Sequence, residues 1–340
     1  MDKPVINPKY VSVSGYGYSG SGACVDLLKE FEGFGALQGE FRIAKDPHGL
    51  CELEELLVHN WDVIRHDIAI KDFLAYCDIL SRGTGIFNKV GKDFSNKLDI
   101  DFMLESKKYI DSLAYMTYLG DTAVHRYNIP AYKNFIMKLR TKFSKYRNNN
   151  AKQMFFARPV ESDFIKETRN YINNLFYKYM ELEKIDTLVI DQAISPTNIT
   201  DTSRYFEHVK VIIIDRDPRD IYANMVKRNH LFGPELLNRE SYEKYIQWYE
   251  QSRRLSEKDR NNSDIDEYVL RLSFEDLVFK FDDSVEKISN FLGGNMRHID
   301  KGKYFSTEYS AKNVGLWKHY HDQSIMDKIG KELKSYCYDY

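Results

Sequence analysis

The stretch Tyr10–Phe31, YVSVSGYGYSGSGACVDLLKEF, decides the fold of this 340-residue chain. It predicts a buried strand over 10–14, a glycine-rich turn over 15–22 and an amphipathic helix that begins near Ser21. The glycines of the turn allow positive φ angles and a close approach to a ligand, and the helix N-terminus offers free N–H groups to an anion. The stretch therefore predicts a phosphate-binding strand–loop–helix, with a turn that merely tolerates glycine as the alternative.

The turn differs from the loop that binds nucleoside triphosphates, because no Gly-Lys-Ser/Thr ends it and no lysine is placed for the β- and γ-phosphates. The segment YSGSGACVDLL resembles the 5′-phosphosulfate loop of sulfotransferases, which bind 3′-phosphoadenosine 5′-phosphosulfate (PAPS). That loop usually reads Pro-Lys/Arg-Ser-Gly-Thr-Thr before an apolar helix. Tyr18 stands here at the basic position and Gly22 at the second hydroxyl position. The residues that the resemblance assigns to the phosphosulfate are Tyr18, Ser19, Gly20, Ser21, Gly22 and Ala23.

A second motif, VKVIIIDRDPRDIYANMV, covers residues 209–226. Its apolar β-branched residues predict a fully buried strand, and Asp217-Pro218 predicts a helix with proline in its first turn. Buried strands seldom end in two arginines without an anion or carboxylate partner. The segment resembles the 3′-phosphate loop of the same family, which implies that Arg216 and Asn224, at the position of the family's serine, bind that phosphate. An ion-pair cluster that caps the helix, including Arg219 with Asp220, is the alternative.

The third motif, SAKNVGLWKHY over 310–320, resembles the C-terminal nucleotide-binding stretch of the family, commonly Arg-Lys-Gly-x-x-Gly-x-Trp-Lys. The residues that this resemblance assigns to the nucleotide are Lys312, Asn313, Val314, Gly315 and Lys318. Trp317 is expected to be a packing anchor. Between the second and third motifs, RLSFEDL resembles another family segment, in which Ser273 is predicted to cap a helix. The motifs follow the family's order and frame the chain from Tyr10 to Tyr320.

The resemblance and the strand pattern predict an α/β three-layer fold of the P-loop-kinase type, with a mostly parallel sheet and a large helical insertion. We expect one sulfotransferase-like domain with a core of 8–49 and 186–320. The insertion is expected over about 50–185, and a C-terminal helix over 322–338. Further elements that the pattern predicts are strands over 34–43, 187–191 and 268–272 and helices over 102–118 and 239–260.

The composition limits the possible partners. A net charge of −2 gives no overall attraction to nucleic acid. The four cysteines lack the spacing of a metal site or a disulfide framework, which favours a reducing compartment. The sequence contains neither the apolar core of a signal peptide nor an apolar run long enough to cross a membrane, so a cytoplasmic enzyme is expected.

A basic segment lies inside the predicted insertion. No acidic residue occurs from Tyr132 through Lys152. The basic residues of this segment are Lys133, Lys138, Arg140, Lys142, Lys145, Arg147 and Lys152, and they are interleaved with Phe135, Phe143 and Tyr146. A solvated helix face explains such a segment, and peripheral binding to an anionic glycan or a membrane surface through 133–152 is the sharper hypothesis.

The three motifs together imply a PAPS-dependent sulfotransferase that works by in-line displacement without a metal. The acceptor is expected to be a carbohydrate hydroxyl, possibly on an anionic glycan. Glycan sulfotransferases carry a glutamate base on the corresponding strand, which suggests Glu40, with Arg42 on the same side of the strand keeping it ionised. His48 and His66 are competing bases. A P-loop kinase and a non-catalytic nucleotide-binding protein are the rival functions.

Overall fold

The computed structural model describes residues 9–85, 90–120, 122, 129–143, 151–236, 241–257, 265–294 and 296–340; within this part the side chains of 140–143 are not described. The chain divides into two compact units. The first consists of the chain up to Asp46 together with Phe176–Tyr340, and the second is Pro47–Leu175. The second unit overlaps the insertion expected over about 50–185.

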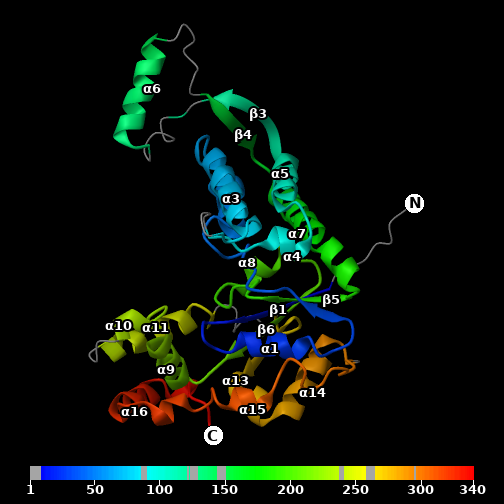
Figure 1. The fold of residues 1–340 in the computed structure, drawn as a ribbon, viewed down its shortest axis with the longest axis vertical. Helices are drawn as coiled ribbons and strands as arrows, with labels where there is room; N and C mark the ends of the chain where they lie inside the picture. Colours follow the sequence, from blue (N-terminus) through cyan, green and yellow to red (C-terminus); the bar gives the residue numbers. More distant parts are fainter. Residues whose placement is uncertain are drawn as a thin grey trace. The chain divides into compact units, whose positions relative to one another are not determined.

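A five-stranded parallel sheet forms the centre of the first unit (Figure 1). Its strands, in spatial order, are β2 (Phe34–Ala36), β5 (Thr187–Asp191), β1 (Lys9–Gly15), β6 (Val209–Asp215) and β7 (Val269–Ser273). Val11 of β1 lies opposite both Val189 of β5 and Lys210 of β6. Because β1 is central and is covered on both faces, six of its seven residues are buried. The glycine-rich turn therefore begins at the carboxyl edge of the middle strand, where open α/β sheets bind ligands.

Helices cover both faces of this sheet, which confirms the predicted three-layer α/β fold. On one face, α1 (Ser21–Leu28), α13 (Phe274–Phe279) and α14 (Phe281–Leu292) pack through one apolar cluster with alternate residues of β1 and β6. On the other face, Tyr10 contacts the rings of Phe176 and Phe206, with ring centroids 5.9 and 5.8 Å apart. Phe176 belongs to α7 (Glu161–Glu183), and α8 (Ile199–Ser203) precedes Phe206.

A second apolar cluster joins the helices that follow β6. These helices are α9 (Pro218–Arg228), α10 (Gly233–Leu236), α11 (Tyr242–Arg254) and α16 (Gln323–Glu332). Short helices complete the C-terminal region, namely α15 (Thr307–Ala311) and the 3₁₀ turns Leu316–His319 and Lys334–Tyr336. Pro218 occupies the first turn of α9 and the Asp217 side chain accepts from the Arg219 N–H, as the sequence predicts for a helix start.

The second unit contains helices and a two-stranded antiparallel sheet, β3 (Ala114–Gly120) and β4 (Lys152–Ala157). Its helices are α2 (Leu50–Glu54), the π-helix Glu55–His59, α3 (Arg65–Ser81), α4 (Phe94–Leu98), α5 (Phe102–Leu113), α6 (Ala131–Phe143) and the first part of α7. Rings of α3, α5 and α7 form its core, with Tyr109 stacked on Tyr171 at 4.6 Å. Among the described residues, none of the helices combines the length and the apolar character needed to cross a bilayer.

Four predicted elements need correction. The strand expected over 34–43 ends at Ala36, because Gly39 with φ 88° turns the chain. The helix expected over 102–118 ends at Leu113, where Ala114 becomes extended and the β-favouring Tyr115–Leu119 pairs with β4. Two other helices end earlier than predicted. The helix expected over 239–260 is described as α11, Tyr242–Arg254, and the one expected over 322–338 is α16 followed by a 3₁₀ turn.

Candidate active site on both sides of the glycine-rich loop

The loop between β1 and α1 has a backbone that only glycine permits at two positions. A Cβ atom on Gly15 would lie 1.9 Å from the Ser19 Oγ, and one on Gly20 would lie 2.4 Å from the Phe274 ring. Gly17 and Gly20 have φ angles of 90° and 91°, and Tyr18 between them also has a positive φ of 54°. Gly20 precedes α1 without a side-chain cap, and its carbonyl accepts from the Ala23 N–H at 3.0 Å. The N–H groups of Ser21 and Gly22, at the start of the helix, can therefore donate to an anion.

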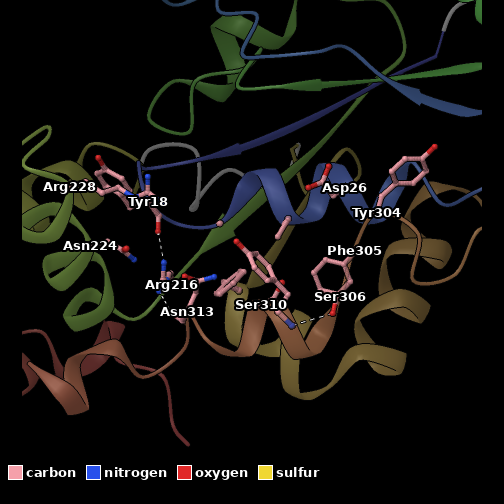
Figure 2. Close-up of a pocket in the computed structure, with 14 residues that line it drawn as sticks. Tyr18, Asp26, Arg216, Asn224, Arg228, Tyr304, Phe305, Ser306, Ser310 and Asn313 are labelled. Atoms are coloured by element: carbon pink, nitrogen blue, oxygen red, sulfur yellow. Dashed lines mark hydrogen bonds between the residues drawn. The ribbon is translucent and has the colours of Figure 1, made fainter.

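One cavity beside this loop has a volume of about 360 Å³ (Figure 2). We call it the Arg216 cavity. Its lining residues are Tyr18, Gly20, Ala23, Asp26, Arg216, Asn224, Arg228, Phe274, Tyr304, Phe305, Ser306, Tyr309, Ser310 and Asn313. They come from the loop and α1, from the end of β6 with α9, and from the segments that start α13 and surround α15. All three sequence motifs thus contribute to one cavity.

Arg216 connects the three motifs. Its side chain is buried, its Nη1 donates to the Tyr18 carbonyl at 3.1 Å, and its Nη2 donates to the Asn313 carbonyl. Asn224, with its amide oxygen turned toward the guanidinium, accepts from Nη1 at 2.9 Å and Nη2 at 3.2 Å. The Arg216 Nε has no hydrogen-bond partner among the described residues. In this orientation the Asn224 amide nitrogen keeps its two donors for another acceptor.

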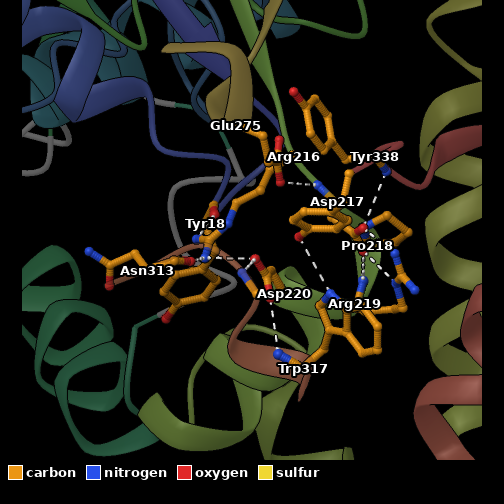
Figure 3. Close-up of polar contacts among 12 residues, drawn as sticks. Tyr18, Arg216, Asp217, Pro218, Arg219, Asp220, Glu275, Asn313, Trp317 and Tyr338 are labelled. Carbon is orange, nitrogen blue, oxygen red and sulfur yellow. Dashed lines mark hydrogen bonds and ion pairs between the residues drawn. The ribbon is translucent and has the colours of Figure 1, made fainter. Parts of the chain in front are cut away.

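Buried carboxylates position these segments (Figure 3). Asp220 accepts from the backbone N–H groups of Gly315 at 2.8 Å and Trp317 at 3.1 Å. Burial raises the pKa of the Asp220 carboxyl, although Arg216, at 3.6 Å, acts in the opposite direction. Asp220 therefore ties the third motif to α9.

Arg219 pairs with Asp217, whereas the ion-pair alternative paired it with Asp220. Two donors of its guanidinium contact the Asp217 carboxylate at 2.9 and 2.6 Å, and its plane lies 3.9 Å from the Trp317 ring centre. The Asp217 N–H donates to Glu275 at 2.9 Å, and burial raises the pKa of the Glu275 carboxyl to about 7. The ion-pair cluster therefore exists beside Arg216 and holds the helix start in place.

A second cavity of about 620 Å³ lies on the other side of the loop. We call it the Lys45 cavity. Its lining residues are Gly15, Tyr16, Gly17, Tyr18, Glu40, Arg42, Lys45, Gln192, Ser195, Pro196, Thr197, His230, Leu231, Trp248 and Ser252. Tyr18 lines both cavities, so the loop is their common wall. Most of the lining groups can form hydrogen bonds, which suits a ligand rich in hydroxyl groups.

The charged groups of the Lys45 cavity lie in the bend that follows β2. The Glu40 side chain is 48% exposed, so a ligand can reach its carboxylate. Arg42 binds Asp46 closely, with 2.6 Å between Nε and Oδ1, and approaches Glu40 only to 3.5 Å. The predicted Glu40–Arg42 contact is therefore secondary to Arg42–Asp46. Glu40 follows the turn at Gly39 and does not stand at a strand end.

Lys45 is a candidate that the sequence analysis missed. Burial, with the Arg42 charge beside it, lowers the pKa of the Lys45 ammonium to about 8. Its Nζ donates to Gln192 Oε1 at 2.8 Å, and Gln192 in turn donates to the Ser21 Oγ at 3.1 Å. Two hydrogen bonds thus connect a cation to the first residue of α1. A basic residue soon after a predicted strand edge was the signal that could have identified it.

The structure brings together some of the predicted site residues and leaves others aside. Those that line the Arg216 cavity are Tyr18, Gly20, Ala23, Arg216, Asn224 and Asn313. The predicted residues that are not among its described lining residues are Ser19, Ser21, Gly22, Lys312, Val314, Gly315 and Lys318. Lys318 lies over the Tyr340 ring at 4.3 Å. The lining residues with polar side chains that lie outside the motifs are Arg228, Tyr304, Ser306 and Tyr309.

The two competing histidines belong to the second unit. His48 lies near Glu52, with Nδ1 and Oε1 3.5 Å apart. His66 is fully buried, and its ring nitrogens contact the carbonyls of Asp62 and Phe155 at 2.7 and 3.0 Å. Such partners make His66 a structural residue, so it is withdrawn as a base. Neither histidine lines a described cavity beside the loop.

The family model of the sulfotransferase family matches residues 123–297, about half of the chain. The chain therefore belongs to the sulfotransferase family, and it is a PAPS-dependent sulfotransferase. No curated protein sequence matches it. Similar solved structures include a sulfotransferase from Mycobacterium avium, 11% identical over 98% of this chain and 76% of that one, with a TM-score of 0.38. Another is a retinol dehydratase in complex with androsterone and the inactive cofactor PAP, 13% identical over 97% and 81%, with a TM-score of 0.34.

The residues of the Arg216 cavity fit PAPS. Its volume of about 360 Å³ is within the range of roughly 300–1,000 Å³ that is typical of small-molecule sites. Two arginines and an asparagine amide supply donors for phosphate, and the start of α1 supplies backbone donors. The Arg216 Nε is a buried donor that still lacks an acceptor. The Phe274, Tyr304 and Phe305 rings supply apolar surface for a base.

Proposed function

We propose that the enzyme transfers the sulfuryl group of PAPS to a carbohydrate hydroxyl, with the nucleotide in the Arg216 cavity and the acceptor in the Lys45 cavity. The observation that carries this proposal is that the glycine-rich loop lines both cavities, with Tyr18 common to the two. A phosphosulfate held by the loop would then face a hydroxyl on the other side. The hydrogen-bonding side chains of the Lys45 cavity, together with the Trp248 ring, favour a carbohydrate over an apolar alcohol.

Donor binding would rest on three sets of groups. The N–H groups of the loop and of the start of α1 would hold the 5′-phosphosulfate. Arg216 and Asn224 would donate to the 3′-phosphate, with Arg228 available at the same cavity. Lys312, Gly315 and Lys318 stay proposed contacts of the third motif, although Gly315 already donates its N–H to Asp220.

Acceptor activation would rest on the Lys45 cavity. PAPS supplies the sulfuryl group, whose bond to the 5′-phosphate oxygen breaks as a bond to the acceptor oxygen forms. Glu40 would accept the proton of the acceptor hydroxyl, since its carboxylate is exposed to the cavity. Lys45 would offset the negative charge that develops near the loop, which has Tyr18 where the family has a basic residue.

Transfer of label from ³⁵S-PAPS tests this proposal. The full chain would be incubated with three classes of acceptor: neutral glycosides, acidic polysaccharides, and phenols or sterols. We expect labelled carbohydrate product and little product from phenols or sterols. Transfer that favours a phenol or sterol would contradict the carbohydrate assignment while leaving sulfuryl transfer intact.

A further inference from the structure

Helix α6 presents an apolar face to solvent. Tyr132, Phe135, Ile136 and Leu139 follow the spacing i, i+3, i+4 and i+7, which places them on one side of the helix. All four are exposed, and Phe135 exposes 62% of its surface. Among the described residues, no element forms an extensive contact with α6.

Helix α5 of the same unit shows what such a face normally does. Its Phe102, Tyr109, Ile110 and Leu113 are all buried. Isolated helices of about 12–15 residues are marginal in water, and most helical stability in proteins comes from packing of the apolar face. Helix α6 has 13 residues, and in the part of the chain that the structure describes no element packs extensively on this face. The face is therefore suited to a surface outside the described chain.

Strand β3 adds further apolar side chains in the same segment. Tyr115, Met116, Tyr118 and Leu119 are exposed, and Leu119 exposes 78% of its surface. Helix α6 lies in the chain between β3 and β4, which pair with each other (Figure 1). One hairpin segment, 114–157, thus carries eight of the large exposed apolar side chains.

The charge of this segment identifies the class of partner. No acidic residue occurs between Tyr132 and Lys152, and the sequence places seven lysines and arginines there. Lys133 and Lys138 are exposed and lie on opposite flanks of the apolar face of α6. An apolar face between basic residues is the pattern of helices that lie in the interface of anionic membranes, where lysine stems extend toward the headgroups.

We propose that α6, with the exposed side chains of β3, binds peripherally to the surface of an anionic lipid membrane. The apolar face of α6 enters the interface between headgroups and acyl chains, and Lys133 and Lys138 contact lipid phosphates. An anionic glycan would use the charges and leave the apolar face uncovered. A second copy of the chain would bring two basic segments together. This proposal does not rest on the identity of the acceptor.

Vesicle co-sedimentation with the full chain tests the proposal. Vesicles of phosphatidylcholine alone are compared with vesicles that also contain phosphatidylglycerol, at low and high salt. We expect binding to the anionic vesicles only, and weaker binding at high salt because surface charges are screened. The double variant Phe135→Ser/Leu139→Ser should lower partitioning about 10–100-fold, since two apolar side chains no longer enter the interface. Lys133→Gln/Lys138→Gln should bind less and show a weaker salt dependence, since two of the seven basic residues are neutral.

The control variant Leu104→Ser/Val160→Ser removes two exposed apolar side chains elsewhere in the second unit. It should bind vesicles like the wild type, and all variants should keep the wild-type melting temperature within a few degrees. Equal vesicle binding by Phe135→Ser/Leu139→Ser and the wild type would overturn the proposal, as would absence of binding to anionic vesicles. Binding to an acidic polysaccharide that depends only on the lysines would identify a glycan site instead. Dimers that Phe135→Ser/Leu139→Ser abolishes, without vesicle binding, would identify a second copy as the partner.

Discussion

The Arg216 cavity and the Lys45 cavity share one loop, and the chain builds them differently. Arg216 joins the Tyr18 and Asn313 carbonyls, which lie 198 and 97 residues away in sequence, inside a network of buried charges. Glu40, Arg42 and Lys45 lie within one short bend, and Glu40 is half exposed. The comparison teaches that the proposed donor site is built into a framework of buried strand ends, whereas the proposed acceptor site depends on a few groups that a ligand can reach.

The largest effect is expected for a Glu40 variant, which should lose turnover and keep its affinity for the nucleotide. Glu40→Gln should lower turnover by roughly 10²–10⁴-fold, because the amide cannot accept the proton of the acceptor hydroxyl. The affinity for the product nucleotide 3′-phosphoadenosine 5′-phosphate (PAP) should stay at the wild-type value, since Glu40 lines only the Lys45 cavity. Single-turnover rates and calorimetric titration with PAP measure the two quantities. Turnover within a few-fold of the wild type would remove Glu40 as the base and return attention to His48.

Lys45 should make turnover depend on pH. The ammonium loses its proton as pH rises through about 8, so the charge that we propose supports transfer is present below that pH and lost above it. Wild-type turnover should therefore fall on the alkaline side with an apparent pKa near 8. Lys45→Met should lower turnover by about 10²–10³-fold at pH 7. Lys45→Arg should recover part of this loss and move the alkaline limb to higher pH; an unchanged limb would exclude Lys45 as its origin.

Variants of Arg216 and Arg219 distinguish an arginine that contacts the ligand from one that supports the structure. Arg216→Ala should weaken PAP about 10–150-fold, the loss of a charge-assisted hydrogen bond, and weaken AMP less because AMP has no 3′-phosphate. Arg219→Ala is the matched control, because Arg219 is bound to Asp217 and stacked on Trp317 outside the cavity lining. It should lower the melting temperature and keep the ratio of PAP to AMP affinity. Equal losses of both nucleotides in Arg216→Ala would make Arg216 purely structural.

Two glycines of the loop provide the smallest and most local test. Gly20→Ala should cost about 1–2 kcal/mol in the free energy of unfolding because an L-residue must adopt a left-handed conformation there, and more because its Cβ meets Phe274. Gly22 has open space around its Cβ position and lies in α1, so Gly22→Ala should be neutral or stabilising by about 0.5–1 kcal/mol. Urea unfolding measures both variants. Equal stability of the two would contradict the described loop backbone.

The sequence predicted the framework of the first unit because its signals are local. Five β-branched residues in 209–214 form a buried strand, the Asp217-Pro218 pair begins α9, and helix α1 begins at Ser21 as its glycine-rich approach indicates. The family resemblance, carried by three motifs, is confirmed by the family match. Roles of individual site residues stay predictions that the variants above address.

Other features could not be read from the sequence because tertiary packing decides them. Lys45 is half-buried beside Gln192, which lies 147 residues away, and burial together with the Arg42 charge lowers its pKa. Arg228 and Tyr304 reach the Arg216 cavity from α9 and from the segment before α15, without a motif of their own. Strand β4 begins 32 positions after the end of β3. No short turn joins the two strands, so the sequence contains no turn motif that would predict their pairing.

The ranking of nucleotides by affinity tests the central claim most directly. The claim is that two separate phosphate sites, the loop with the start of α1 and the Arg216–Asn224 pair, recognise a nucleotide with a 3′-phosphate and a 5′-phosphate. Calorimetric titration of the wild-type chain should rank PAP above AMP and above ATP with Mg²⁺. Binding of ATP with Mg²⁺ more tightly than PAP would contradict the claim, because it would require a triphosphate site that the loop does not provide.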